Sequence, residues 1–137
     1  MREVGWPRLL NEYVIKISQR AATEKFAFGS FDCAHIAADW VWLCTGNDPL
    51  ADYRGKYSSK KEAEELIGDG LLKRLTEALG EPLHPSQGQR GDIALRVADG
   101  SCGILFTSGA RMRGLFLSEK SGLVMHRLQD IDYIFRV

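Results

Sequence analysis

The feature that most constrains the fold is a change of hydrophobic period midway along the chain. Residues 6–17 and 33–44 place apolar side chains three and four positions apart, which is typical of one face of an amphipathic helix. Residues 59–67 and 70–80 predict two shorter helices of the same kind. From residue 91 onward, five short apolar runs are separated by Gly, Ser and Asp, which is typical of β-strands that are close in sequence and antiparallel. Helices followed by strands predict an α+β domain.

Length and charge narrow the possible partners. The chain has 137 residues, which favours one compact domain, and we take residues 1–137 as that domain. Lys and Arg together number 18, and so do Asp and Glu, so the formal net charge is zero. This balance lacks the basic excess that is typical of nucleic-acid-binding domains. The chain also has no apolar run of the roughly 18 residues that a membrane-spanning helix needs, and it does not begin with the layout of a secretion signal. We therefore expect synthesis in a cytoplasm, no nucleic-acid partner and no stable membrane insertion.

The three cysteines are the first candidates for reactive residues. Cys33, Cys44 and Cys102 are widely spaced and form no CxxC pair, which predicts free thiols and neither a metal nor a cofactor. Cys33 begins the second predicted helix, where backbone N–H groups and the helix dipole favour a thiolate. Asp32 is a candidate N-cap for that helix, with Ser30 as the alternative. Cys33 also begins an apolar stripe that continues to Cys44. Three roles are therefore open for Cys33: a buried core residue, a nucleophile or a redox-active thiol.

Several short segments carry a resemblance to known proteins. Residues 28–33 (FGSFDC) opening a helix, then residues 90–95 (RGDIAL) and 102–106 (CGILF), resemble the papain-like cysteine peptidases of the NlpC type, which cut peptide bonds of the bacterial cell wall. Four segments resemble small proteins encoded in the tail modules of long-tailed phages and prophages, a divergent branch of the same fold: residues 26–40 (FAFGSFDCAHIAADW), 46–57 (GNDPLADYRGKY), 90–95 (RGDIAL) and 122–137 (GLVMHRLQDIDYIFRV). The resemblance implies a papain-like NlpC-type domain, with N-terminal helices packed on a C-terminal antiparallel sheet of about five strands.

The same resemblance implies a catalytic cysteine, but this sequence lacks the histidine that is the general base in the family. Cys33 takes the place of the catalytic cysteine, and its backbone N–H takes that of an oxyanion donor. The family's histidine, which precedes "GI" on the next strand, falls at Ser101 or Cys102. Neither side chain acts as a general base near pH 7 as imidazole does. The remaining candidates for the base are His84, in the Pro-rich connector, and His126, in the fourth strand-like run.

The missing histidine favours a structural role over catalysis. The resemblance then implies a phage tail component, at the tail tip, that is made in the host bacterial cytoplasm, resides in the virion and contacts other tail proteins in a symmetric assembly. The alternative is an active cell-wall cysteine peptidase or amidase that acts on peptidoglycan through Cys33, and a third reading is a free-standing thiol hydrolase. Aromatic and arginine side chains outside the helical stripes are the expected contacts with neighbouring proteins: Trp42, Tyr53, Arg54, Tyr57, Arg111 and Arg113.

Overall fold

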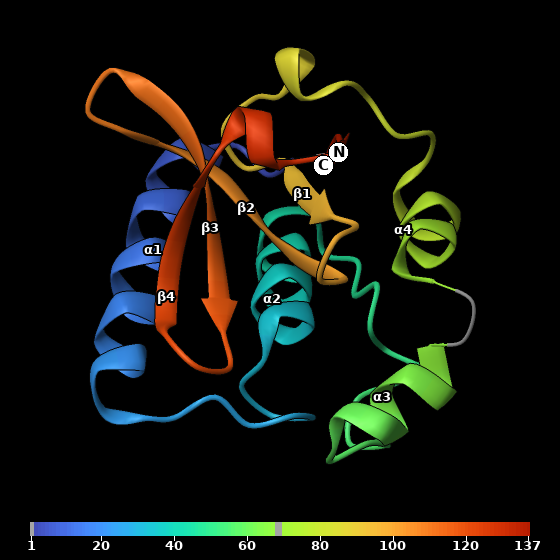
Figure 1. Ribbon diagram of the computed structural model, residues 1–137. Helices are drawn as coiled ribbons and strands as arrows, with labels where there is room; N and C mark the ends of the chain where they lie inside the picture. The colour runs from blue at the N-terminus through green and yellow to red at the C-terminus, as the bar shows by residue number, and fades with distance from the viewer. Residues whose placement is uncertain (1, 68–69) are drawn as a thin grey trace.

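The computed structural model describes residues 2–67 and 70–137. Within these residues, helices precede strands as the change of period predicts (Figure 1). The α-helices are α1 (Trp6–Thr23), α2 (Cys33–Thr45), α3 (Lys60–Ile67) and α4 (Leu71–Leu79). The strands are β1 (Ile93–Arg96), β2 (Ser101–Ser108), β3 (Arg111–Ser118), β4 (Gly122–Arg127) and β5 (Tyr133–Phe135), with short 3-10 turns η1 (Pro85–Gln87) and η2 (Leu128–Asp130).

The five strands form one antiparallel sheet in the order β4-β3-β2-β1-β5. The first four strands follow one another across the sheet, and β5 returns to pair with β1 at the opposite edge. β2 is therefore the central strand. Its register with β1 pairs Cys102 with Leu95, so Cys102 lies near the start of the central strand. The prediction of an α+β domain with about five antiparallel strands is confirmed.

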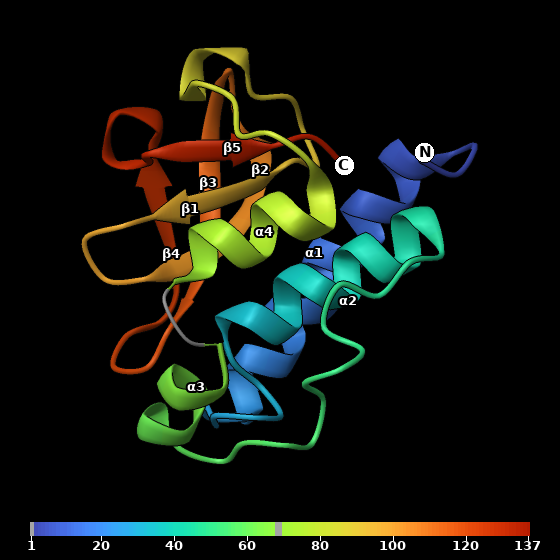
Figure 2. The ribbon, with the colours of Figure 1, turned by 90° about the vertical axis from the view of Figure 1, so that its right-hand side faces the viewer.

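α1 and α2 lie side by side against one face of the sheet, and α4 lies near the β1–β5 edge (Figures 1 and 2). α2 is the most deeply buried helix, because the stripe predicted from the sequence includes Ile36, Trp40 and Cys44, all inside the core. The fully buried Trp40 ring also donates a hydrogen bond from Nε1 to the Gly91 carbonyl oxygen at 2.8 Å. This bond fixes α2 against the turn that leads into β1.

The opposite face of the sheet carries a smaller apolar cluster. Alternate side chains of the strands point to this face, as the period of two requires, and η2 supplies a neighbouring segment that packs on them. The buried members are Ala94, Leu105, Phe116, Ile131 and Ile134. Both faces of the central strands are thus covered, while the start of β2 faces α2.

A buried carboxylate joins the two ends of the described chain. Asp92 is fully buried and accepts hydrogen bonds from Arg2 Nη2 at 2.6 Å and from Arg136 Nε at 3.0 Å. Arg2 Nε also donates to the Val137 carbonyl oxygen at 2.8 Å. We call these four residues the Asp92 cluster. The two arginines come from opposite ends of the chain, so the sequence around Asp92 gives no indication of this cluster.

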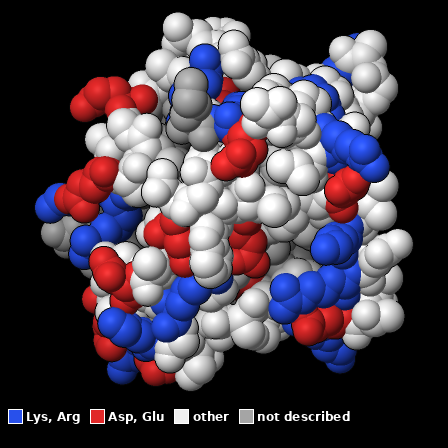
Figure 3. Space-filling view, turned by 180° about the vertical axis from the view of Figure 1, so that it is seen from behind, with Lys and Arg blue, Asp and Glu red and all other residues white. Residues whose placement is uncertain are grey.

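Two further features concern possible partners: the length and apolarity of the helices, and the distribution of charge on the surface. In the part of the chain that the structure describes, none of the helices is long and apolar enough to cross a membrane. On the face shown in Figure 3, acidic and basic side chains are interspersed, in keeping with the zero formal net charge.

Candidate functional site

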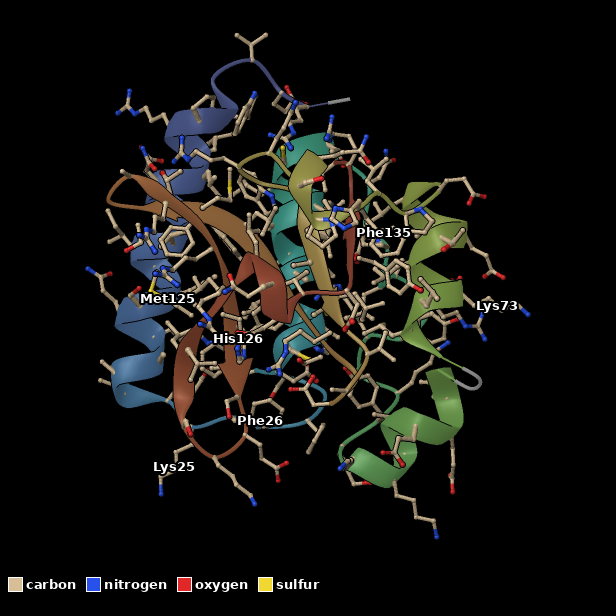
Figure 4. All side chains as sticks on the ribbon, turned by 45° about the horizontal axis from the view of Figure 1, so that its top comes forward. Lys25, Phe26, Lys73, Met125, His126 and Phe135 are labelled. Carbon is tan, nitrogen blue, oxygen red and sulfur yellow. The ribbon has the colours of Figure 1, made fainter. Side chains whose placement is uncertain are left out.

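A cleft of about 640 Å³ opens at the N-terminal end of α2. Its walls come from the segment before α2, the first residues of α2, α3, the turn between β1 and β2, and the β3–β4 hairpin. Figure 4 labels Phe26, from the segment before α2, and His126, from β4, which belong to two of these walls. Cys33 is partly exposed and lines the cleft, although it also packs against the main core. Cys33 therefore presents part of its surface to the cleft.

The start of α2 is built by a tight turn and a side-chain cap. Asp32 Oδ1 accepts a hydrogen bond from the backbone N–H of His35 at 2.8 Å, so Asp32, not Ser30, is the N-cap. Asp32 Oδ2 accepts a second bond from the backbone N–H of Gly29 at 2.8 Å. Gly29 has φ +88°, and a Cβ there would overlap the carbonyl oxygen of Tyr57. Only glycine fits this turn, because the backbone is both left-handed and closely packed.

Asp32 also lies at the centre of a buried side-chain network. Its carboxylate accepts hydrogen bonds from His35 Nδ1 at 2.8 Å and from the Tyr57 hydroxyl at 2.7 Å. The carboxylate is only an acceptor, which assigns the proton to His35 Nδ1. Burial alone would raise the pKa of Asp32, but the hydrogen bonds from His35, Gly29 and Tyr57 together lower it below its ordinary value. Burial and the neighbouring Asp32 raise the pKa of Tyr57 well above its ordinary value, so the hydroxyl remains a donor.

The position of Tyr57 corrects one expectation. Tyr57 was expected to contact a neighbouring protein, but it is only 5% exposed in this structure. The loop of residues 46–57 folds back so that the Tyr57 hydroxyl reaches Asp32, 25 positions earlier in the chain. Tyr57 is therefore a positioning residue of the site and offers no surface to a partner.

Cys102 points at the position of the expected nucleophile. Its Sγ donates a hydrogen bond to the Cys33 carbonyl oxygen at 3.6 Å. Interaction with the Cys102 side chain lowers the pKa of Cys33, and the same interaction, together with burial, raises the pKa of Cys102. Ser101, the other position at which the family's histidine could fall, donates a hydrogen bond from its hydroxyl to Asp99 at 2.5 Å. A protonated thiol therefore faces Cys33 from the start of β2.

The candidate bases lie in different places. His126 lines the same cleft as Cys33, and Arg96 Nη1 lies 2.7 Å from its Nε2. Because guanidinium is only a donor, Nε2 is the acceptor in this contact. Burial and the charge of Arg96 lower the pKa of His126, so its ring is neutral near pH 7. His84 caps the exposed turn η1, with Nδ1 2.8 Å from the Ser86 hydroxyl, and it is not among the residues that line the cleft.

The remaining interface candidates lie on the helical half and on β3. Trp42 is 51% exposed, and the Arg54 guanidinium lies 5.2 Å from its ring centre. Arg54 also forms ion pairs with Asp39 at 2.7 Å and Asp48 at 2.6 Å, which hold the loop of residues 46–57 against α2. Tyr53 is partly exposed, Arg111 is exposed and Arg113 is partly exposed. Their contact with another protein stays a prediction.

Among residues 2–67 and 70–137, no group of three or more His, Cys, Asp or Glu side chains is placed so that it could hold a metal ion. The chemical groups that line the cleft near Cys33 include its own thiol, the Asp32 carboxylate, the Tyr57 phenol and the imidazole of His126.

Comparison with known proteins assigns the chain to one protein family. No curated protein matches the chain. A family described as "Domain of unknown function (DUF6950)" matches residues 1–137. The match spans every helix and strand described above, and with them both Cys33 and Cys102. The chain therefore belongs to the DUF6950 family, over its whole length.

Proposed function

We propose that the protein is a structural component of a phage tail, located at the tail tip, and that it has a papain-like NlpC-type fold with a degenerate catalytic site. The order of helices and antiparallel strands supports this fold, as does the cysteine at the start of α2. The resemblance of four segments to phage tail-module proteins supports the location. The observation that carries the proposal is the contact of Cys102 with Cys33 at the place where a peptidase needs an imidazole.

A thiol at this position does not replace the histidine. A general base must accept the proton of the nucleophile within hydrogen-bonding reach. The pKa of Cys102 is raised by its interaction with the Cys33 side chain and by burial, so Cys102 holds its own proton near pH 7. The Asp32 network does not supply a base either, because its lowered pKa keeps the carboxylate ionised and its oxygens already accept four hydrogen bonds.

The structural role requires contact with other tail proteins. A tail tube has rotational symmetry, so copies of the protein would repeat around one axis. Trp42 on α2 and Arg111 and Arg113 on β3 are of residue types enriched at protein interfaces, and each is at least partly exposed. The protein would be made in the bacterial cytoplasm and be carried in the virion.

The test is genetic, in a phage or prophage that encodes the chain. Deletion of the gene is expected to abolish complete tails, whereas Cys33→Ser is expected to leave tail assembly and infectivity intact. Cys44→Ser is the matched control, because Cys44 is fully buried at the far end of α2. Tails that assemble normally with Cys33→Ser but fail to cross the cell wall would contradict the structural role.

The second candidate function is a cell-wall cysteine peptidase or amidase. It is favoured by the partly exposed Cys33 with a lowered pKa and by the neutral His126 in the same cleft. Purified protein would then release peptides from peptidoglycan, and both Cys33→Ser and His126→Ala would abolish the release. Absence of products with the wild-type protein, alongside normal tail assembly, would exclude this function.

A further inference from the structure

Two of the three cysteines form a pair in which only Cys33 is partly exposed. Cys33 is partly exposed in the wall of the cleft, whereas Cys102 is only 2% exposed and lies behind it on β2. The third thiol, Cys44, is fully buried at the C-terminal end of α2. An oxidant that enters the cleft therefore meets Cys33 first.

The Cys33 and Cys102 side chains also lie next to each other, which a disulfide between them would need. The two cysteines are 69 positions apart in sequence, yet Cys102 Sγ donates a hydrogen bond to the Cys33 carbonyl oxygen at 3.6 Å, and the Cys102 side chain acts directly on the pKa of Cys33. A disulfide requires two sulfurs about 2.05 Å apart on neighbouring backbones. The contact of Cys102 Sγ with the Cys33 backbone shows that the two backbones are neighbours, as this bond requires.

We propose that Cys33 and Cys102 are a redox-active pair that reacts with a low-molecular-weight peptide disulfide, with Cys33 as the attacking thiol and Cys102 as the resolving thiol. The proposal rests on the geometry of these two residues, and it holds or fails independently of the tail role.

The reaction balances in two steps. In the first, the Cys33 thiolate attacks one sulfur of the disulfide, its S–S bond breaks, and a mixed disulfide and one free thiolate form. In the second, Cys102 loses its proton and its sulfur attacks Cys33 Sγ. The mixed disulfide breaks, and the Cys33–Cys102 bond forms as the second small thiol leaves. The protein loses two electrons and two protons, and the small disulfide gains both.

The electrostatics of the pair support this order. Interaction with the Cys102 side chain lowers the pKa of Cys33, and the N-terminal end of α2 favours the thiolate further. The pKa of Cys102 is raised chiefly by its interaction with the Cys33 side chain and by burial, with the Cys33 charge adding to both. When Cys33 is consumed in the mixed disulfide, its charge is gone, and Cys102 can ionise more easily. Formation of the mixed disulfide at Cys33 thus makes the Cys102 thiol easier to ionise for the second step.

The cleft is suited to a zwitterionic peptide disulfide such as glutathione disulfide. Its volume is about 640 Å³, and its walls carry both basic and acidic side chains. The basic ones include Lys60, Arg96 and Lys120, which can pair with carboxylates of the peptide. The acidic ones include Glu64 and Glu119, which can pair with its ammonium groups.

The test is incubation of the reduced, folded protein with glutathione disulfide, followed by thiol titration, intact mass and peptide mapping. In the wild type the number of free thiols is expected to fall from three to one. The mass is expected to fall by two hydrogen atoms, with Cys33 linked to Cys102 and Cys44 unmodified. Three results would each overturn the proposal: a product that stays at the mixed disulfide of Cys33, a Cys33–Cys44 link, or no reaction in the folded state.

Single variants separate the two roles. Cys102→Ser and Cys102→Ala are expected to stop with one glutathione on Cys33, whereas Cys33→Ser is expected to leave Cys102 unreacted because it is buried. Cys44→Ser is the matched control and is expected to form the Cys33–Cys102 bond as the wild type does. Circular dichroism checks that each variant is folded, and the wild-type mapping decides the proposal even if one variant is not. Labelling of Cys102 in Cys33→Ser at the wild-type rate would contradict its resolving role.

Discussion

Substitution of Gly29 by alanine tests how the turn before α2 supports the site. Gly29 has φ +88°, and a left-handed backbone costs an L-residue roughly 1–2 kcal/mol. A Cβ at Gly29 would also overlap the carbonyl oxygen of Tyr57, which is backbone and cannot rotate away. Relief of this overlap moves Tyr57 away from Asp32, and a hydrogen bond to a charged group contributes about 1.5–3 kcal/mol. We therefore expect Gly29→Ala to lower the free energy of unfolding by roughly 3–5 kcal/mol.

The matched control is Gly46→Ala. Gly46 has a similar φ of +82° at the C-cap of α2, but a Cβ there would meet no heavy atom within 4 Å. Its cost is expected to be the backbone strain alone, about 1–2 kcal/mol. Urea unfolding followed by circular dichroism and tryptophan fluorescence measures both free energies. If the two variants lose the same stability to within about 0.5 kcal/mol, the close approach of Gly29 to Tyr57 does not support the fold as argued.

Three further changes test the buried polar groups. Tyr57→Phe is expected to lower the free energy of unfolding by about 1.5–3 kcal/mol, because it removes a hydrogen bond to an ionised carboxylate. Tyr53→Phe, at a partly exposed side chain, is its control in the same urea titration. The pKa of Asp32 is lower in the folded than in the unfolded state, so the stability it contributes is present above the ordinary pKa of about 3.9 and is lost as the pH falls through the lowered value. Asp32→Asn is expected to flatten that acid limb of the stability curve, and an unchanged slope would refute the assignment. Asp92→Ala is expected to cost about 3–5 kcal/mol by thermal or urea unfolding, because it leaves a mostly buried arginine without its partner; a loss below about 1 kcal/mol would show that the arginine finds another.

The sequence predicted what depends on near neighbours along the chain. The stripe from Cys33 to Cys44 became α2, and Asp32 became its N-cap, because helix period and capping act over three or four positions. Gly70 and Gly80 bound α4 as expected. The five strand-like runs became one antiparallel sheet, because short turns leave sequential strands little choice but to pair.

The polar contacts of the site depend on distant parts of the chain, and the sequence did not predict them. Tyr57 was expected at the surface, since nothing near it in sequence indicates that its hydroxyl meets Asp32. Cys102 was identified only as a residue in the place of a histidine. Its contact with Cys33 comes from the packing of α2 on β2. A tyrosine is compatible with core and surface alike, and the tendency of cysteine to be buried does not say which residue it contacts, so residue type gave no signal for either contact.

The Asp92 cluster also has a mechanical consequence. Tension applied between residues 2 and 137 acts directly on the Arg2–Val137 hydrogen bond and on the Arg2 and Arg136 contacts with one carboxylate. Ionic hydrogen bonds around a buried charge resist small displacements, because any separation leaves that charge without a partner. A load passed through the two ends is therefore borne first by this cluster.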